Sequence, residues 1–252
     1  MHISVITIFP AMFNAYMQEG ILGRALERDL FRLDVHNLRD FTSDRHRSVD
    51  DAPYGGGPGM VMRPEPFAEA IRKIKSDGVP TLTIMPTPEG KPFNQAMAEE
   101  LSLEPKRLLF LAGRYEGIDD RVRQTFVDRE ISLGDYILTG GELAVLVILD
   151  AVLRLVPGAV GDEDSLKEES FSWGILDYPH YTRPAEWENQ KVPEALLTGN
   201  HKQIALWRRK EALRRTMRLR PELMLKAGLT KTDNKLIKEI QEEEEDVFDK
   251  RS

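Results

Sequence analysis

The sequence predicts an α/β fold with a mostly parallel sheet, followed by a small all-helical domain. Strand and helix patterns alternate over the first 155 residues. The strands among them are nearly continuous apolar runs, as expected of a parallel sheet that is covered on both faces. Beyond residue 161 the chain becomes acidic and polar, and then it shows only helical patterns. We therefore expect an α/β domain over 1–160, a flexible linker over 161–178 and a helical domain over 179–252.

The expected strands are short segments of apolar and β-branched residues, and the expected helices have apolar residues three and four apart. Strands are predicted over 2–9, 81–85, 108–112 and 130–133, and helices over 12–30, 66–75, 94–103 and 141–156. Further helices are predicted over 192–197, 201–220, 221–227 and 232–243, the last capped by Thr232 or Asp233. Ligands of parallel sheets bind beyond the carboxyl ends of the strands, so a site is expected in the loops there.

Composition excludes several classes of protein. The 252 residues are 41% apolar and include no cysteine, which excludes disulfides, thiolate zinc sites and cysteine nucleophiles. The longest apolar run, 143–156, contains Asp150 and Arg154 and is shorter than the roughly 18 residues that a membrane span needs. The first residues also lack a signal-peptide pattern. We expect a cytoplasmic protein that has no membrane partner.

The charge of the chain is unevenly distributed. The net charge is −7, yet residues 201–220 hold eight Lys and Arg against one acid, so this window is +7 and the remainder is −14. Such a density of cations is typical of a surface that binds the phosphates of nucleic acid. A solvated helix face, or a partner for the acidic residues after 241, would give the same pattern.

Glycine-rich loops are the main functional signals. Residues 50–60 (DDAPYGGGPGM) match neither a P-loop nor a dinucleotide fingerprint, and a flexible surface loop is the alternative. Residues 113–117 and 132–141 each follow a predicted strand, and with 86–88 they could form one pocket lined by backbone groups and by Tyr136 or Leu138. For 113–117 the alternative is a surface turn with a local ion pair between Arg114 and Glu116. Likewise, Asp150 and Arg154 could simply form an i,i+4 ion pair on the exposed face of the predicted apolar helix.

Six segments occur in a recognisable order and spacing. They are DDAPYGGGPGMVMRPEP (50–66), AGRYEGIDDRV (112–122), ISLGDYILTGGELA (131–144), RLVPGAVG (154–161), ESFSWGILDYPHYTRP (169–184) and VPEALLTGNHKQIALWR (192–208). Together they closely resemble the bacterial tRNA (guanine-37-N1)-methyltransferases of the SPOUT superfamily. The resemblance implies a deep trefoil knot in the α/β domain, a homodimer with shared active sites, and S-adenosylmethionine as the methyl donor.

The resemblance also implies which residues contact the methyl donor. They lie in the three loops that follow strands: Met85, Pro86, Pro88, Gly113, Tyr115, Glu116, Gly117, Ser132, Leu133, Gly134, Asp135, Tyr136, Ile137, Leu138, Gly140 and Gly141. Adenine and ribose pressed against backbone would explain the glycines, since a glycine has no Cβ.

Methylation of N1 of a neutral guanine requires a base that removes its proton and a group that stabilises charge developing toward O6. The family uses an aspartate in an Asp-Ser-Phe motif and an arginine on the knot helix. Arg154 matches the arginine, whereas Glu169 stands at the aspartate position, in Glu-Ser-Phe. Glutamate has the same charge and a similar reference pKa, so Glu169 is the predicted base. Asp164 and Glu168 are nearby alternatives.

The remaining matches concern RNA. Positions tied to activity or tRNA contact in relatives are Asp50, Gly59, Arg114, Asp177, His180, Asn200, His201, Arg208, Arg209 and Arg215. The partner implied is the anticodon branch of tRNA, from which the target base must be flipped. Mg²⁺ near the carboxylates is a further implication, although no metal-ligand motif is present. A knotted methyltransferase with another target, or a non-catalytic RNA-binding relative, are the alternatives.

Overall fold

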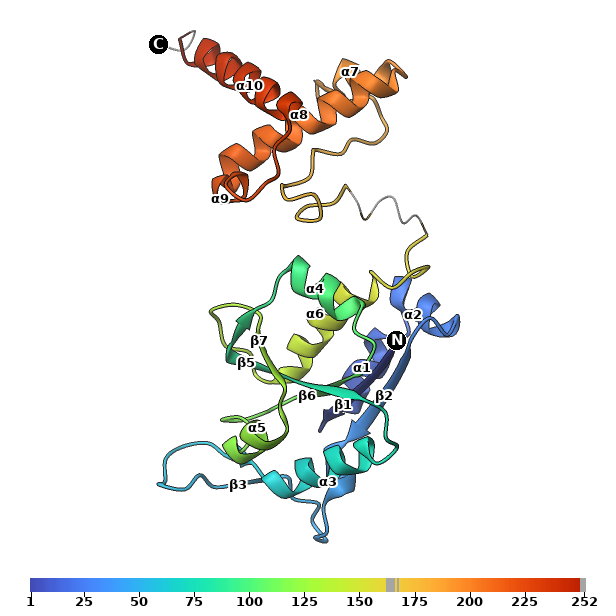
Figure 1. Cartoon of the computed structure of the whole chain (residues 1–252), viewed down its shortest axis with the longest axis vertical. Helices are drawn as coiled ribbons and strands as arrows, with labels where there is room; N and C mark the ends of the chain where they lie inside the picture. The colour runs from blue at the N-terminus through green and yellow to red at the C-terminus, as the bar shows by residue number, and fades with distance from the viewer. Residues whose placement is uncertain (162–165, 167, 250–252) are drawn as a thin grey trace. The chain divides into compact units, whose positions relative to one another are not determined.

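The α/β part of the chain is built on one five-stranded parallel sheet. The computed structural model describes residues 1–161, 166 and 168–249, and contacts divide the chain into unit 1, Met1–Glu163, and unit 2, Asp164–Ser252. The sheet of unit 1 has the order β2-β1-β6-β5-β7. Its strands are β1 (His2–Thr7), β2 (Arg32–Asn37), β5 (Thr81–Pro92), β6 (Arg107–Leu111) and β7 (Arg129–Ser132) (Figure 1). Every pairing between them is parallel, so the predicted fold class is confirmed.

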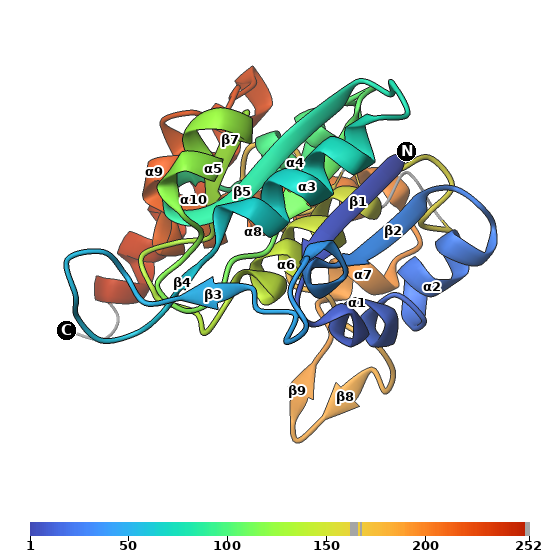
Figure 2. The same cartoon turned by 90° about the horizontal axis from the view of Figure 1, so that it is seen from below.

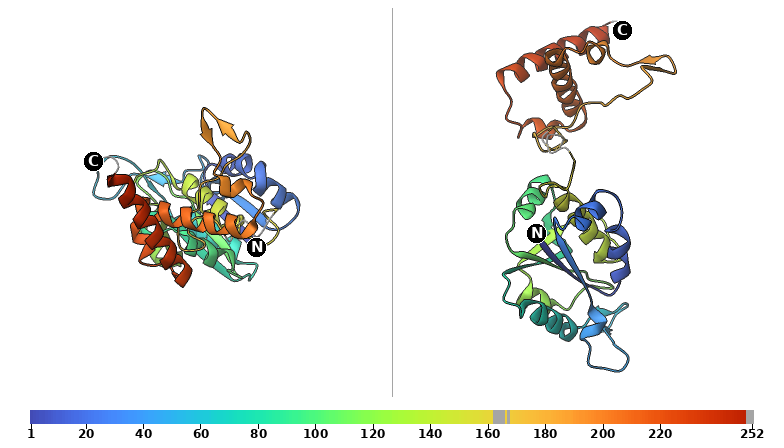
Figure 3. Two further views of the ribbon diagram at one scale, coloured as in Figure 1. Left: turned by 90° about the horizontal axis from the view of Figure 1, so that it is seen from above. Right: turned by 90° about the vertical axis from the view of Figure 1, so that its right-hand side faces the viewer.

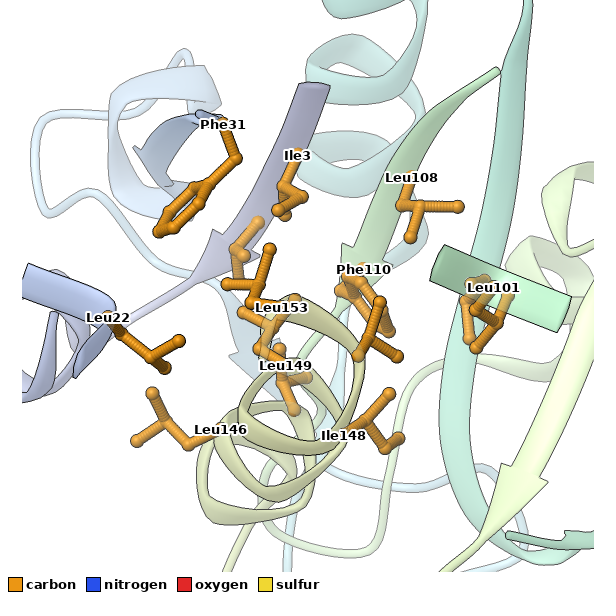
Figure 4. Packing of buried hydrophobic residues seen from close by; sticks show 14 of the residues in the cluster. Ile3, Leu22, Phe31, Leu101, Leu108, Phe110, Leu146, Ile148, Leu149 and Leu153 are labelled. Carbon is orange, nitrogen blue, oxygen red and sulfur yellow. The ribbon is translucent and has the colours of Figure 1, made fainter. Parts of the chain in front are cut away.

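Helices cover both faces of this sheet. One face carries α1 (Pro10–Tyr16), α2 (Gly20–Glu27), α4 (Gln95–Ser102) and α6 (Gly141–Leu153), whose buried side chains join Ile3 and Phe110 in the larger core (Figure 4). The other face carries α3 (Pro64–Lys75), α5 (Asp120–Phe126) and the 3-10 helix η1 (Leu38–Phe41). Because both faces are covered, all five residues of β6 are buried, which explains its continuous apolar sequence.

One local prediction was wrong, and two elements of unit 1 next to it or to the site were missed. The helix expected over 12–30 is two helices, because Gly20 adopts φ +65° and begins a second one. A short turn over 28–31 joins that second helix to β2, which was missed because its half-exposed sequence RLDVHN contains no apolar run. Helix α5 was also missed, since seven residues with four charged or amide side chains carry little periodicity.

The glycine-rich segment 50–60 forms most of a protruding ribbon. Strands β3 (Asp50–Asp51) and β4 (Val61–Met62) pair antiparallel on either side of it (Figure 2). Gly55, Gly56 and Gly57 have positive φ with open space around them. The loop tip is therefore exposed, as the flexible-loop alternative expected, but its base is fixed by pairing.

Unit 2 is a helical domain with its own core. Its helices are α7 (Glu194–Leu197), α8 (His201–Leu219), α9 (Pro221–Met224) and α10 (Lys231–Asp249), and a small hairpin of β8 (Glu186–Trp187) and β9 (Gln190–Lys191), which the sequence did not predict, precedes them. Helix α10 lies beside α8 (Figure 3). Ile175 and Tyr178, at the end of the segment predicted as linker, are buried in this core, so the segment is not separate over its whole length. Within the part of the chain that the structure describes, no helix is long and apolar enough to cross a membrane.

A buried carboxylate fixes the start of α10. Asp233 is 2% exposed and accepts two hydrogen bonds from Arg209, at 2.7 and 3.1 Å. Asp233 also accepts from the backbone N–H of Thr230 and returns its own N–H to the Thr230 hydroxyl, a reciprocal cap. The Arg209 guanidinium lowers the pKa of Asp233 to about 2.

Removing this charge should destabilise unit 2 in a pH-dependent way. The folded pKa of Asp233 lies below its unfolded value, so its contribution is complete above about pH 4 and is lost as the pH falls toward 2. We expect Asp233→Asn to lower the free energy of unfolding by about 2 kcal/mol at pH 7. All three tryptophans, Trp173, Trp187 and Trp207, lie in unit 2, so urea unfolding followed by tryptophan fluorescence reports on this unit.

The control is Glu222→Gln, which removes an ion pair with Arg220 in which both side chains are about half exposed. Such a pair contributes little, so the urea midpoint should not move. Equal urea midpoints for Asp233→Asn and wild type at pH 7 would contradict the stabilising role assigned to Asp233.

Candidate functional site

A cavity of about 480 Å³ lies at the carboxyl ends of β6 and β7, beside the second half of β5. Three segments of unit 1 line it, drawn from 85–89, 113–118 and 131–141. Every residue that the sequence predicted to contact the methyl donor lines this cavity except Asp135. The structure therefore brings together three loops that are separate in the sequence, at the place where parallel sheets bind ligands.

Several further lining residues were not among those predicted to contact the methyl donor. They are Thr87, Glu89, Ile118, Asp120, Arg123, Ile131 and Ala144, together with Arg114, which was expected to face RNA. Ile118 and Asp120 belong to the matched segment 112–122 and could have been found there. Arg123 lies on the missed helix α5, so no signal pointed to it.

Backbone contacts join the second and third segments. The N–H of Gly141 donates to the carbonyl of Gly113 at 2.7 Å, and Arg114 and Gly140 form an antiparallel bridge. The first segment is held differently, because the pairing of β5 with β7 shifts register between Pro86 and Lys91. The irregular stretch therefore turns its residues into the cavity instead of continuing the ladder.

One buried ion pair crosses the same junction. Glu142, in the first turn of α6, has a fully buried side chain. Its carboxylate accepts from Arg114 Nε at 2.7 Å and from the hydroxyl of Thr7 at 2.9 Å. Arg114 was expected either to contact RNA or to pair with Glu116. The pairing with Glu116 is wrong, because the guanidinium turns toward the helix and away from its own loop.

The structure gives a different reason for two of the glycines. A Cβ at Gly140 would collide with the Arg114 guanidinium, and one at Gly141 would lie 2.9 Å from the backbone nitrogen of Gly113. These positions lack side chains because the protein packs against itself there. By contrast, Gly117 has φ +114° with open space around it, as a backbone wall facing a ligand would have.

The ribbon at 50–62 is joined to the cavity wall. The N–H of Glu116 donates to the carbonyl of Met60 at 3.0 Å, and the N–H of Met62 donates to Gly117 at 2.9 Å. Gly59 has φ +88°, and a Cβ there would overlap the Glu116 side chain. Asp50, at the base of the ribbon, pairs in register with Met62. Gly59 is thus next to the cavity, whereas the exposed glycines of the tip are not.

The lining suits a ligand that is cationic and partly apolar. Tyr136, Ile137 and Leu138 expose apolar surface, with Ile137 82% exposed. Glu116 supplies negative charge, whereas Glu89 and Asp120 each pair with Arg123, which also lines the cavity. The glycine-containing loops supply backbone donors and acceptors. No hydrogen bond or ion pair of the Glu116 carboxylate is formed among the described residues. A sulfonium nucleotide fits this set, with its positive centre near the Glu116 carboxylate and its flat base against apolar side chains.

The two residues predicted to be catalytic lie in different units. Arg154 is the C-cap of α6 in unit 1, one residue beyond Leu153, where the helix ends. Glu169 is half-buried in unit 2, and its carbonyl accepts from the N–H of Ser172. The alternative base Asp164 lies outside the described residues. Asp150 accepts from the hydroxyl of Tyr16 at 2.8 Å, and this hydrogen bond raises the pKa of Tyr16.

Four residues predicted to contact tRNA gather in unit 2. The ring of His180 lies 2.8 Å from the Asp177 carboxylate, and Arg215 approaches the Asp177 carbonyl at 3.5 Å. Arg208 lies over the ring of Tyr178 at 4.8 Å. At the other end of α8, Asn200 caps the helix by accepting from the N–H of Lys202, and His201 is exposed at its first position.

Part of the basic block is neutralised within unit 2. Arg209 is paired with Asp233, Lys210 with Glu239 and Glu243, and Arg214 with Glu211 and Glu243. For Lys210 and Arg214, which both pair with Glu243, the alternative of a partner for the acidic residues after 241 is therefore confirmed. Arg209 is anchored in the fold by Asp233, which lies before that tail. Arg208 and Arg215 lie instead against the segment that contains Asp177.

Comparison with known proteins identifies the family. A sequence profile described as "tRNA (Guanine-1)-methyltransferase TrmD" matches residues 1–226. The chain is 53% identical to a protein of Dictyoglomus turgidum, over 96% of this chain and 98% of that one. It is 49% identical to one of Dehalococcoides mccartyi, over 97% and 98%, and 52% identical to one of Citrifermentans bemidjiense, over 96% of both. All three are named tRNA (guanine-N(1)-)-methyltransferase.

Among the described residues, no group of three or more His, Cys, Asp or Glu side chains is arranged to hold a metal ion. The knotted SPOUT fold follows from membership, since the profile covers all of the parallel sheet. The chain belongs to the TrmD family of tRNA (guanine-N1)-methyltransferases.

Proposed function

We propose that this protein transfers a methyl group from S-adenosylmethionine to N1 of guanosine 37 of tRNA, next to the anticodon. Membership of the family supports guanine-N1 methylation of tRNA, and the resemblance of the six segments supports position 37. The observation that carries the proposal is the convergence of segments 85–89, 113–118 and 131–141 on one cavity.

Each class of lining residue has a role in binding the donor. The donor supplies an electrophilic methyl group on a positively charged sulfur. Tyr136 and Leu138 offer apolar surface to a base, and the backbone of Gly113 and Gly141 closes the floor. The carboxylate of Glu116, which has no partner among the described residues, favours a cationic ligand in the same space. These residues bind and orient the donor; none of them removes the proton.

The proton at N1 of guanine is removed by Glu169. Its carboxylate accepts the proton, while the positive charge of Arg154 stabilises charge that develops toward O6. The neighbouring carboxylate of Glu168, which accepts from the Tyr178 hydroxyl and lies 3.9 Å from Arg208, is an alternative base. Asp164 stays an alternative from sequence alone.

Unit 2 holds the anticodon branch. Asp177, His180, Arg208 and Arg215 form one side of this surface, with Asn200 and His201 at the start of α8. Asp50 and Gly59 add contacts from the ribbon of unit 1. Arg114, by its pairing with Glu142, contributes to the wall of the cavity.

Two further parts of the proposal concern assembly and metal. We propose a homodimer with shared sites, supported by the exposed apolar residues Phe9, Tyr16, Leu143 and Val147 on or beside α1 and α6. Mg²⁺ would act near the carboxylates, although no group of side chains among the described residues is arranged to hold it. A tRNA substrate also favours a cytoplasmic location. A related activity on another nucleotide, and RNA binding without catalysis, are the competing functions.

Guanosine 37 should be required. With labelled S-adenosylmethionine and tRNA transcripts, we expect methyl incorporation into the transcript with guanosine 37 and none when adenosine replaces it. Transcripts that differ at the 5′ neighbour, position 36, serve as a matched set. Incorporation that is insensitive to the base at 37 would refute the target, and no incorporation into any transcript would favour a non-catalytic protein.

Glu169 should be essential for turnover and not for donor binding. A general base contributes roughly 10²–10⁴-fold, so Glu169→Gln should lower single-turnover methylation by that factor. The neighbouring Glu168→Gln is the matched control and should stay within about threefold of wild type. If Glu169→Gln turned over normally, or if only Glu168→Gln were inactive, the base would lie elsewhere.

Arg208 and Arg215 should contribute phosphate contacts. We expect their double replacement by glutamine to weaken tRNA binding and to reduce the slope of log K against log salt by up to about 2. Lys210→Gln is the control, since Lys210 is already paired with Glu239 and Glu243. Filter binding across a salt series measures both. If only Lys210→Gln changed the slope, the phosphate contact would belong to Lys210 and not to Arg208 and Arg215.

A further inference from the structure

Glu142 is a buried charge for which the mechanism above has no use. Its side chain is 0% exposed in unit 1. An isolated buried carboxylate is strongly unfavourable, so its presence needs compensation. Arg114 Nε and the Thr7 hydroxyl both donate to it, and the positive end of α6 lies at its own backbone.

The partner of Glu142 is part of the cavity wall. Arg114 lines the cavity, and only 19% of its side chain is exposed. From the loop after β6 its side chain crosses Gly140, where a Cβ would collide with it, and reaches the first turn of α6. On the way it donates to the carbonyl of Thr139 at 3.2 Å.

The face of the guanidinium is also held. Arg114 lies over the ring of Phe9, 4.6 Å from its centroid, and Phe9 N–H donates to the Thr7 hydroxyl that itself binds Glu142. The carboxylate therefore sets the direction of a side chain that is packed against the loop at 139–141. That loop forms one wall of the cavity and the loop at 113–117 forms another.

We propose that Glu142 is a positioning residue for methyl transfer: by holding Arg114 across Gly140, it pre-forms the two walls between which the methyl donor binds. The inference rests on the proposed function, because it assigns the cavity to the donor. Glu142 itself touches no reactant. Loss of the Glu142 charge should release the loop at 139–141. Binding of the donor must then order this loop, and that entropic cost weakens the affinity for the donor.

If Glu142 only stabilised the fold, its replacement would leave the donor Kd unchanged. The chain offers a matched control, a second ion pair away from the cavity. Asp77 pairs with Arg107, whose side chain is 3% exposed, through hydrogen bonds of 2.7 and 3.1 Å. Neither residue lines the cavity. Asp77→Asn and Glu142→Gln each neutralise one carboxylate that pairs with a buried or largely buried arginine, and each keeps the shape of the side chain.

The test is isothermal titration of the full-length protein with S-adenosylmethionine, alongside thermal unfolding followed by far-ultraviolet circular dichroism. We expect Glu142→Gln to raise the donor Kd about tenfold, the loss of one charged hydrogen bond, with kcat at saturating donor within about threefold. Asp77→Asn should lower stability and leave the donor Kd unchanged. Glu142→Asp, which keeps the charge, should recover part of the affinity.

A double-mutant cycle decides whether Glu142 acts through Arg114. If it does, adding Glu142→Gln to Arg114→Gln should change the donor Kd by less than about twofold. Additive losses, or a donor Kd for Glu142→Gln equal to that of wild type, would overturn the inference. Wild-type protein that fails to bind S-adenosylmethionine would instead overturn the proposed function, so the two failures are distinguishable.

Discussion

The buried ion pair between Arg114 and Glu142 is the contact on which the geometry of the site depends. The loop after β6 and the loop before α6 have few side chains with which to hold each other, because both are rich in glycine. The Gly113–Gly141 hydrogen bond and the Arg114–Glu142 pair connect them at the edge of the sheet. The glycines at 140 and 141 leave room for this contact. Packing within the protein therefore explains why these two positions lack side chains, without reference to a ligand.

In unit 2, ion pairs within the domain determine which cations can contact a binding partner. The net charge of −7 conceals a window of +7 at 201–220, but that window is itself partly neutralised by α10. Lys210 and Arg214 share Glu243, and Arg209 is fixed by Asp233. Of the other cations, Arg208 and Arg215 lie against the segment around Asp177, and the proposed phosphate contacts are on that side of α8.

Much of the parallel sheet could be predicted because its strands are buried on both faces. The runs at 2–9 and 108–112 are apolar for that reason, whereas β2 lies at the sheet edge and its residues alternate without a clear run. The loops that line the cavity could be predicted because glycines and matched segments marked them. Glu142 was not found, because its role depends on Thr7 and Arg114, and no local pattern connects residues 135 and 28 positions apart.

The central claim is that three loops of unit 1 enclose the methyl donor. A crystal structure of the protein grown with S-adenosylmethionine tests it most directly. The account predicts density for the nucleotide bounded by Pro88, Gly113 and Leu138, with Arg114 still paired to Glu142. Density for the nucleotide at another surface, with these loops enclosing only solvent, would contradict it.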